Sequence, residues 1–274
     1  MTVQLPRIAI LGAGSMGGAI LAGLVAPGVT ADGVTVTNRT AAKADALGLP
    51  GVVSLATERD PAANARALAG ARIVLIAVKP GMVSDLLDAI RDDLEPGALV
   101  ISVAVGVTAA TMEARMRNTV VRAMPNTPST VGRGVTGISA GTRAGAADVE
   151  LASLLFGTVG DVVVVPESRL DALSAISGSG PAYVFLLIAE LERTAQRLGF
   201  SAEQAEVMVR GTFRGASELL AASGADPAEL RRRVTSPKGT TERAVAVLEE
   251  ARLSEVFDRA AAAAIARARE LADG

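Results

Sequence analysis

The stretch Ile8-Ala-Ile-Leu-Gly-Ala-Gly-Ser-Met-Gly17 decides how the first half of this chain folds. Its first four residues are apolar, as in a buried strand, and its glycines then follow the spacing G-x-G-x-x-G. In that motif the first glycine makes a tight turn, the second lets the backbone approach a pyrophosphate, and the third lets the next helix pack on the strand. With Gly12, Gly14 and Gly17 in these positions, the stretch predicts a dinucleotide-binding turn; the alternative is a glycine-rich turn without a ligand.

Outward from this turn, short β-branched runs alternate with helical patterns, which is typical of βαβ units. The expected strands are 8–11, 34–37, 73–78, 99–103, 120–123, 135–139 and 162–165, and the expected helices between them are 16–25, 41–47, 82–90 and 108–116. The run Ile73–Val78 is apolar at every position, as suits a strand that helices cover on both faces. These patterns predict an α/β fold with a doubly wound sheet of the Rossmann type.

After Val165 the pattern becomes purely helical. Amphipathic helices are expected over 181–198, 202–222, 227–233, 240–250 and 253–271, with Ser201 and Asp226 as N-caps and Gly199 and Gly224 as stops. We therefore expect a domain boundary near Pro166, with a Rossmann domain over 1–165 and an all-α domain over 166–274. The alanine-rich last helix fits either an ordinary core helix or a subunit interface.

The composition excludes several kinds of chemistry and partner. The 274 residues include no cysteine and no histidine, so a disulfide, a zinc–thiolate site, a thiol nucleophile and an imidazole base are all excluded. A net charge of -2 offers no basic face for a nucleic acid. Residues 8–31 carry no charge, but their glycines and Pro27 interrupt any membrane span. We expect a cytoplasmic protein without a nucleic-acid or membrane partner.

The end of the second expected strand indicates which dinucleotide is bound. It continues as Asn38-Arg39-Thr40, where a site that prefers NAD normally carries a carboxylate for the ribose diol. An arginine there attracts a 2′-phosphate, as do the amide and hydroxyl beside it. We therefore expect NADPH as the cofactor, with NADH possible but weaker. The alternatives are that Arg39 stacks on the adenine or points to solvent.

The missing histidine also bears on the substrate. Hydride reduction of a ketone creates an alkoxide that needs a proton donor or a Lewis acid. A protonated imine instead yields a neutral amine directly, so binding and orientation suffice. The composition is therefore compatible with reduction of a C=N bond, although Lys79 keeps a carbonyl substrate open.

Four further segments have compositions that ordinary loops seldom show. They are Ala77-Val-Lys-Pro80, Arg122-Ala-Met-Pro-Asn-Thr-Pro128, Ser177-Gly-Ser-Gly-Pro-Ala-Tyr183 and Val234-Thr-Ser-Pro-Lys-Gly-Thr-Thr241. Together with the glycine turn they resemble the pyrroline-5-carboxylate reductases, which catalyse the last step of proline biosynthesis, over nearly the whole chain. The chain departs from the family pattern at Lys238, often glycine, at Val105, often alanine, and at Gly224 and Ala225, often more polar.

The resemblance implies reduction of Δ1-pyrroline-5-carboxylate to proline by NAD(P)H, and it assigns the cofactor contacts by position. It implies pyrophosphate contacts by Gly12, Gly14, Ser15, Met16 and Gly17, adenosine contacts by Asn38, Arg39 and Asn64, and nicotinamide contacts by Ala77, Lys79, Pro80, Ala104 and Val105. It also implies an intertwined homodimer that can assemble further into a decamer. The substrate is then expected between one subunit's Rossmann domain and its partner's helical loop.

The hydroxyl-rich loop suits the carboxylate of this substrate. We expect Ser236, Gly239, Thr240 and Thr241 to bind it through amides and hydroxyls, with Thr241 also contacting the ring nitrogen as the catalytic candidate. The alternative is an ordinary N-cap. Glu167 is a further candidate, to balance the cationic nitrogen, unless it is a solvated surface acid.

Three other functions stay open at this point. A reductase of the β-hydroxyacid type is expected to carry a catalytic lysine in its second domain, but no lysine lies between Lys79 and Lys238. A deazaflavin-NADP reductase explains the turn but not the long helical part. A non-catalytic NADP-sensing protein would bind the cofactor without turnover.

Overall fold

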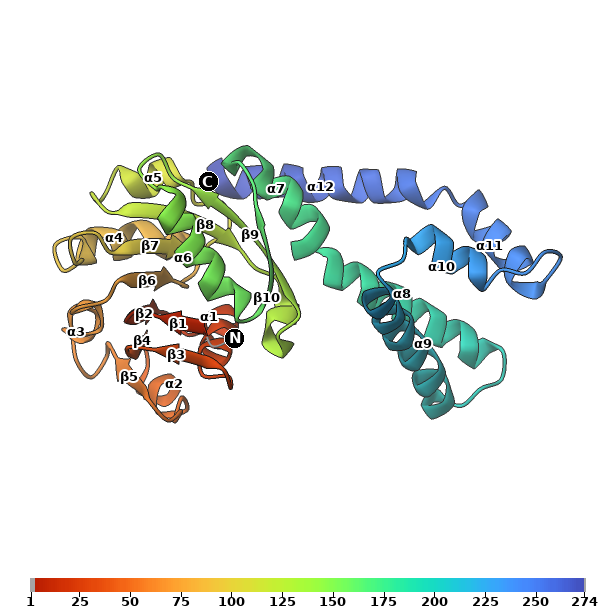
Figure 1. The fold of residues 1–274 in the computed structure, drawn as a ribbon, viewed down its shortest axis with the longest axis horizontal. Coiled ribbons are helices and arrows are strands. Elements are labelled where there is room, and N and C mark those ends of the chain that lie inside the picture. The colour runs from red at the N-terminus through yellow and green to blue at the C-terminus, as the bar shows by residue number, and fades with distance from the viewer. Residues whose placement is uncertain (1–2, 274) are drawn as a thin grey trace. The chain divides into compact units, whose positions relative to one another are not determined.

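The computed structural model describes residues 3–273 and divides the chain into two compact units. The first unit comprises residues up to Ser179 together with those from Ala263 onward, and the second is Gly180–Ala262 (Figure 1).

The first unit is built on an eight-stranded sheet. Its strands are β2 (Ile8–Leu11), β4 (Val34–Asn38), β5 (Val52–Ala56), β6 (Ile73–Ile76), β7 (Leu99–Ser102), β8 (Thr119–Met124), β9 (Gly134–Ala140) and β10 (Gly160–Val164), in the order β10-β9-β8-β7-β6-β2-β4-β5. The central strand β2 pairs in parallel with both β4 and β6, so Leu11 lies opposite Thr37 on one side and Ile76 on the other. This order, with the chain moving outward in both directions from β2, confirms the predicted Rossmann-type sheet.

One edge of the sheet departs from the predicted parallel pattern. Strand β9 runs antiparallel to β8, and β10 then runs parallel to β9. The connection 125–133 holds only the short 3-10 helix η2 (Thr127–Val131), and parallel neighbours need a longer crossover. Strands β1 (Val3–Leu5) and β3 (Val29–Ala31), which the sequence patterns missed, form a separate two-stranded sheet.

Helices cover both faces of the large sheet. They are α1 (Ser15–Leu24), α2 (Ala41–Asp45), α3 (Ala63–Leu68), the 3-10 helix η1 (Pro80–Met82), α4 (Val83–Ile90), α5 (Ala109–Glu113) and α6 (Ala146–Gly157). Alternate residues of β2 enter different cores: Ile8 and Ile10 pack with α1 and α6, whereas Ala9 and Leu11 pack with α3 and α4. Burial on both faces accounts for the continuously apolar strands.

After β10 the described chain is helical. The elements are η3 (Glu167–Arg169), α7 (Leu170–Leu173), the π-helix η4 (Ser174–Gly178), α8 (Gly180–Arg197), α9 (Ala202–Ser223), α10 (Pro227–Arg233), α11 (Thr240–Glu250) and α12 (Leu253–Asp273). The predicted caps are confirmed: Ser201 and Asp226 accept backbone hydrogen bonds at the starts of α9 and α10, and Gly224 ends α9 in the left-handed region.

The second unit leaves much of its apolar surface bare. Helices α8 and α9 pack together, yet Phe185, Leu186 and Val207 stay largely exposed. The helical stretch Glu167–Arg197 is also long and apolar enough to cross a membrane, by length and composition alone. Contiguous exposed apolar surface of this kind is typical of an interaction site.

Candidate cofactor and substrate sites

The glycine turn between β2 and α1 is shaped by backbone contacts that a side chain would destroy. Gly12 has φ 95°, and a Cβ there would lie 2.9 Å from Val78 Cγ1 and 3.0 Å from the carbonyl oxygen of Ala77. A Cβ at Gly17 would lie 2.5 Å from the carbonyl oxygen of Gly12. A Cβ at Gly14 would meet nothing within 4 Å. The first and third glycines are therefore needed by the fold, whereas Gly14 borders open space where a ligand can approach.

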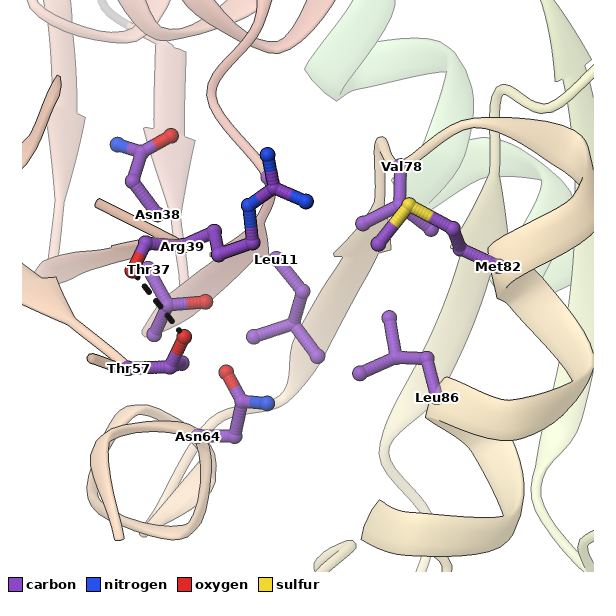
Figure 2. A pocket seen from close by; sticks show the side chains of 10 residues that line it. Leu11, Thr37, Asn38, Arg39, Thr57, Asn64, Val78, Met82 and Leu86 are labelled. Carbon is purple, nitrogen blue, oxygen red and sulfur yellow. Dashed lines mark hydrogen bonds between the residues drawn. The ribbon is translucent and has the colours of Figure 1, made fainter. Parts of the chain in front are cut away.

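A cleft of about 210 Å³ begins at this turn and runs past the carboxyl ends of the strands. It is lined by Leu11, Gly12, Thr37, Asn38, Arg39, Thr57, Asn64, Val78, Met82 and Leu86. Figure 2 shows the polar side chains of Thr37, Thr57 and Asn64 across from the apolar side chains of Val78, Met82 and Leu86. In parallel α/β sheets this edge is where ligands bind.

Two side chains at the end of β4 have polar groups without partners. Asn38 is 5% exposed, and its buried Nδ2 makes no hydrogen bond in the described part of the chain. Arg39 makes no ion pair among residues 3–273, and its side chain extends from the end of β4 toward the side of the cleft where Val78 lies (Figure 2). Thr40 stands at the N-cap of α2, yet its side chain makes no capping bond. Since buried polar groups normally have partners, this corner is suited to a polar ligand.

The other predicted cofactor residues lie in the same unit. Ser15 and Met16 begin α1, and Ala77 lies 3.2 Å from an ideal Cβ at Gly17. Lys79 is the exposed N-cap of η1, with Pro80 as its first residue. Ala104 is buried after β7, where its N–H donates to Ser102 Oγ at 3.2 Å, and Val105 is partly exposed.

The predicted substrate loop forms a single turn at the start of α11. The N–H of Gly239 donates to the carbonyl oxygen of Ser236 at 3.0 Å, and Gly239 is the N-cap of the helix. Thr240 and Thr241 are the first two helical residues, and both are exposed. The turn thus presents the hydroxyl groups of both threonines beside helix-start amides, which suits a carboxylate.

Glu167 has partners inside the first unit. Its Oε1 accepts hydrogen bonds from Nη1 of Arg122 and from the backbone N–H of Ala109, each at 2.8 Å. It is therefore neither a freely solvated acid nor an unpaired group. Its proposed contact with the substrate nitrogen stays a prediction.

Several residues that line the cleft were missed by the sequence patterns. Leu11, Thr37, Val78, Met82 and Leu86 belong to segments that were expected only as strand or helix. Thr57 follows β5, a strand that was not expected at all. The spacing of polar residues after each strand could have indicated Thr57, but only with β5 in place.

Comparisons with known proteins agree with this arrangement. A family model described as pyrroline-5-carboxylate reductase dimerisation matches residues 167–271, and one described as NADP oxidoreductase, coenzyme F420-dependent, matches 7–106. The pyrroline-5-carboxylate reductase of Pseudomonas aeruginosa is 36% identical over 99% of this chain and 98% of its own length.

Solved structures of pyrroline-5-carboxylate reductases are also similar to this chain over nearly its whole length. A pyrroline-5-carboxylate reductase from Coxiella burnetii has a TM-score of 0.88 and 38% identity, covering 97% of this chain and 98% of its own. A Plasmodium falciparum pyrroline carboxylate reductase with NADP bound has a TM-score of 0.79 and 25% identity, covering 97% and 98%.

The fold and these matches define an oxidoreductase with a Rossmann domain and a helical dimerisation domain. Because relatives more than a third identical match it from end to end, the chain belongs to the family of pyrroline-5-carboxylate reductases.

Proposed function

We propose that this protein reduces Δ1-pyrroline-5-carboxylate to L-proline with NADPH in the cytoplasm. The observation that carries the proposal is that the glycine turn and the hydroxyl-rich loop are both accessible to a ligand. Gly14 borders free space at the glycine turn, and the hydroxyls of Thr240 and Thr241 are exposed at the start of α11. The exposed Arg39, which lines the cleft at the end of β4, supports binding of a phosphorylated ribose.

The bound cofactor supplies a hydride to the C=N carbon of the substrate. The pyrophosphate is held by the backbone at Gly12, Gly14, Ser15, Met16 and Gly17. The adenosine end is held by Asn38, Arg39, Thr40 and Asn64. The nicotinamide is bordered by Ala77, Lys79, Pro80, Ala104 and Val105. A protonated imine becomes a neutral amine on reduction, so no histidine is needed.

Thr241 is our candidate for the residue that touches the reacting group. Ser236, Gly239 and Thr240 bind the substrate carboxylate, while the Thr241 hydroxyl contacts the ring nitrogen and helps to retain its proton. Glu167 is a weaker candidate for a contact with that nitrogen, because its Oε1 already pairs with Arg122 and accepts from Ala109.

The test is oxidation of NADPH, followed by absorbance, on mixing with pyrroline-5-carboxylate. Thr241→Ala should lose about 10²- to 10⁴-fold of the rate, and Thr241→Ser should recover most of it. Thr30→Ala removes an exposed hydroxyl from β3 in the first unit and should be silent. Tight NADPH binding without turnover would instead favour the NADP-sensing protein. Turnover only with a hydroxyacid or a deazaflavin would favour the other reductases.

We also propose that the working unit is a homodimer, with decamers formed from dimers. The exposed apolar side chains of α8 and α9, such as Phe185 and Val207, support burial against a second subunit. The functional boundary is proposed near Pro166, since the match to the dimerisation model begins at residue 167. Light scattering on the purified protein separates monomer, dimer and decamer.

A further inference from the structure

The corner of the cofactor cleft is joined to the segment that follows β5. The N–H of Thr57 donates to the carbonyl oxygen of Asn38 at 2.9 Å, and the N–H of Glu58 donates to that of Arg39 at 3.1 Å. The Glu58 side chain continues to the start of α2, where Oε1 accepts a hydrogen bond from the backbone N–H of Ala41. Glu58 thus takes the capping role that the Thr40 side chain leaves unfilled, directly beside Arg39.

The Glu58 carboxylate forms no ion pair within residues 3–273, although after the hydrogen bond to Asp45 its charge also contributes to raising the pKa of Arg59. Its neighbour Arg59 is committed elsewhere, with hydrogen bonds of 2.7 and 2.8 Å to the two carboxylate oxygens of Asp45. The hydrogen bond from Arg59 lowers the pKa of Asp45, so this pair stays ionised. Neither Arg39 nor Lys43, the other cations of this corner, forms an ion pair with Glu58 in the described part of the chain.

We propose that Glu58 sets the balance between NADPH and NADH by opposing Arg39. This inference rests on the proposed function, in which the adenosine ribose lies at the end of β4. A 2′-phosphate carries a charge between about -1.5 and -2, so the Glu58 carboxylate repels it. A 2′-hydroxyl is neutral and can donate a hydrogen bond to a carboxylate. Arg39 therefore favours NADPH, and Glu58 limits that preference and keeps NADH usable.

The substitution Glu58→Gln isolates the charge, because the amide oxygen can still accept from Ala41. The experiment titrates purified protein with NADPH and with NADH, without substrate, and follows cofactor fluorescence. The ratio of NADPH to NADH affinity should rise by about three- to tenfold at low salt, and the rise should shrink at about 0.5 M salt. Glu58→Asp keeps the charge and should leave the ratio near the wild-type value.

The matched control is Asp92→Asn. This carboxylate is 96% exposed, follows the C-terminal end of α4 and is not among the residues that line the cleft. The variant therefore changes the net charge equally and should leave the ratio unaltered. An unchanged ratio in Glu58→Gln, or an equal rise in Asp92→Asn or Glu58→Asp, would overturn the role of Glu58 while the proposed function stands. Wild-type protein that binds neither dinucleotide would overturn the proposed function itself.

Discussion

Arg122 and Glu167 form an ion pair that ties the middle of β8 to the chain that follows β10, with 2.8 Å between Nη1 and Oε1. The side chain of Arg122 is 7% exposed and that of Glu167 is 35% exposed, so the cation is the buried partner. The same Oε1 accepts from Ala109 at the start of α5. One carboxylate thus fixes a helix start and neutralises a buried guanidinium.

Removing this carboxylate should destabilise the protein. Glu167→Ala leaves Arg122 buried without a partner and should lower the free energy of unfolding by about 1–3 kcal/mol, since partial exposure of Glu167 weakens the pair. Glu167→Gln keeps an acceptor for Ala109 but not the charge, and should cost less. Urea unfolding at one fixed protein concentration measures both. The control is Glu150→Ala, on the exposed face of α6, which should change the free energy of unfolding by less than about 0.5 kcal/mol. If Glu167→Ala lowered the free energy of unfolding no more than Glu150→Ala does, the prediction would be contradicted.

The glycines of the turn should separate folding from cofactor binding. Gly14→Ala meets no protein atom within 4 Å, so the protein should fold normally but bind NADPH at least about tenfold more weakly. Gly12→Ala should impair both, because a Cβ at that positive φ meets Val78 and Ala77. Gly18→Ala is the control, since it also has open space but lies inside α1. Thermal unfolding and NADPH titration test the series, and unchanged binding in Gly14→Ala would refute the placement of the pyrophosphate.

Arg39→Ala should reduce the preference for NADPH. The dissociation constant for NADPH should rise by about tenfold or more while that for NADH stays nearly constant, because only NADPH carries the 2′-phosphate. Equal weakening of both cofactors would mean that Arg39 stacks on the adenine. No change in either would mean that Arg39 points to solvent. Arg91→Ala, beyond the end of α4, removes an exposed cation and serves as the control.

The sequence predicted correctly those elements whose ends are set by capping residues and turns close by in the chain. Helices α10 and α11 have the predicted bounds. The Asp226 side chain accepts a hydrogen bond from the N–H of Ala228 in the first turn of α10, and the turn that ends at Gly239 leads directly into Thr240. Strand β5 was missed because Val52–Ala56 is short and only Ala56 in it is buried, so it shows neither continuous burial nor a clear alternation. Strand β9 was expected, but its antiparallel direction follows from pairing with β8, which no local pattern contains.

The same limit applies to the cleft. Gly12, Asn38 and Arg39 were predicted because they belong to the glycine motif or follow a strand as polar residues, whereas Asn64, in α3, was predicted only from the family resemblance. Met82 and Leu86 line the opposite side only because α4 packs beside β6 and β2, a contact between segments far apart in sequence. Glu58 was missed for a related reason: its hydrogen bond to Ala41 spans β5, which was not expected.

The last prediction concerns Lys238, the third residue of the turn that precedes α11. Ser236–Gly239 is a turn closed by a 3.0 Å backbone hydrogen bond, with Pro237 second and Lys238 third at φ 60°. Turns with proline second and positive φ third favour glycine, because a side chain in the left-handed region costs about 1–2 kcal/mol. Lys238→Gly should therefore stabilise the protein by about 0.5–1 kcal/mol, after the extra chain entropy of glycine is subtracted.

The control is Arg243→Gly, inside α11, which should instead destabilise the protein by about 1 kcal/mol. The N–H of Lys238 donates to Oε2 of Glu242 at 2.8 Å, and glycine retains this bond. Lower stability in Lys238→Gly, measured by urea unfolding at fixed protein concentration, would show that the lysine side chain contributes more than its backbone conformation costs.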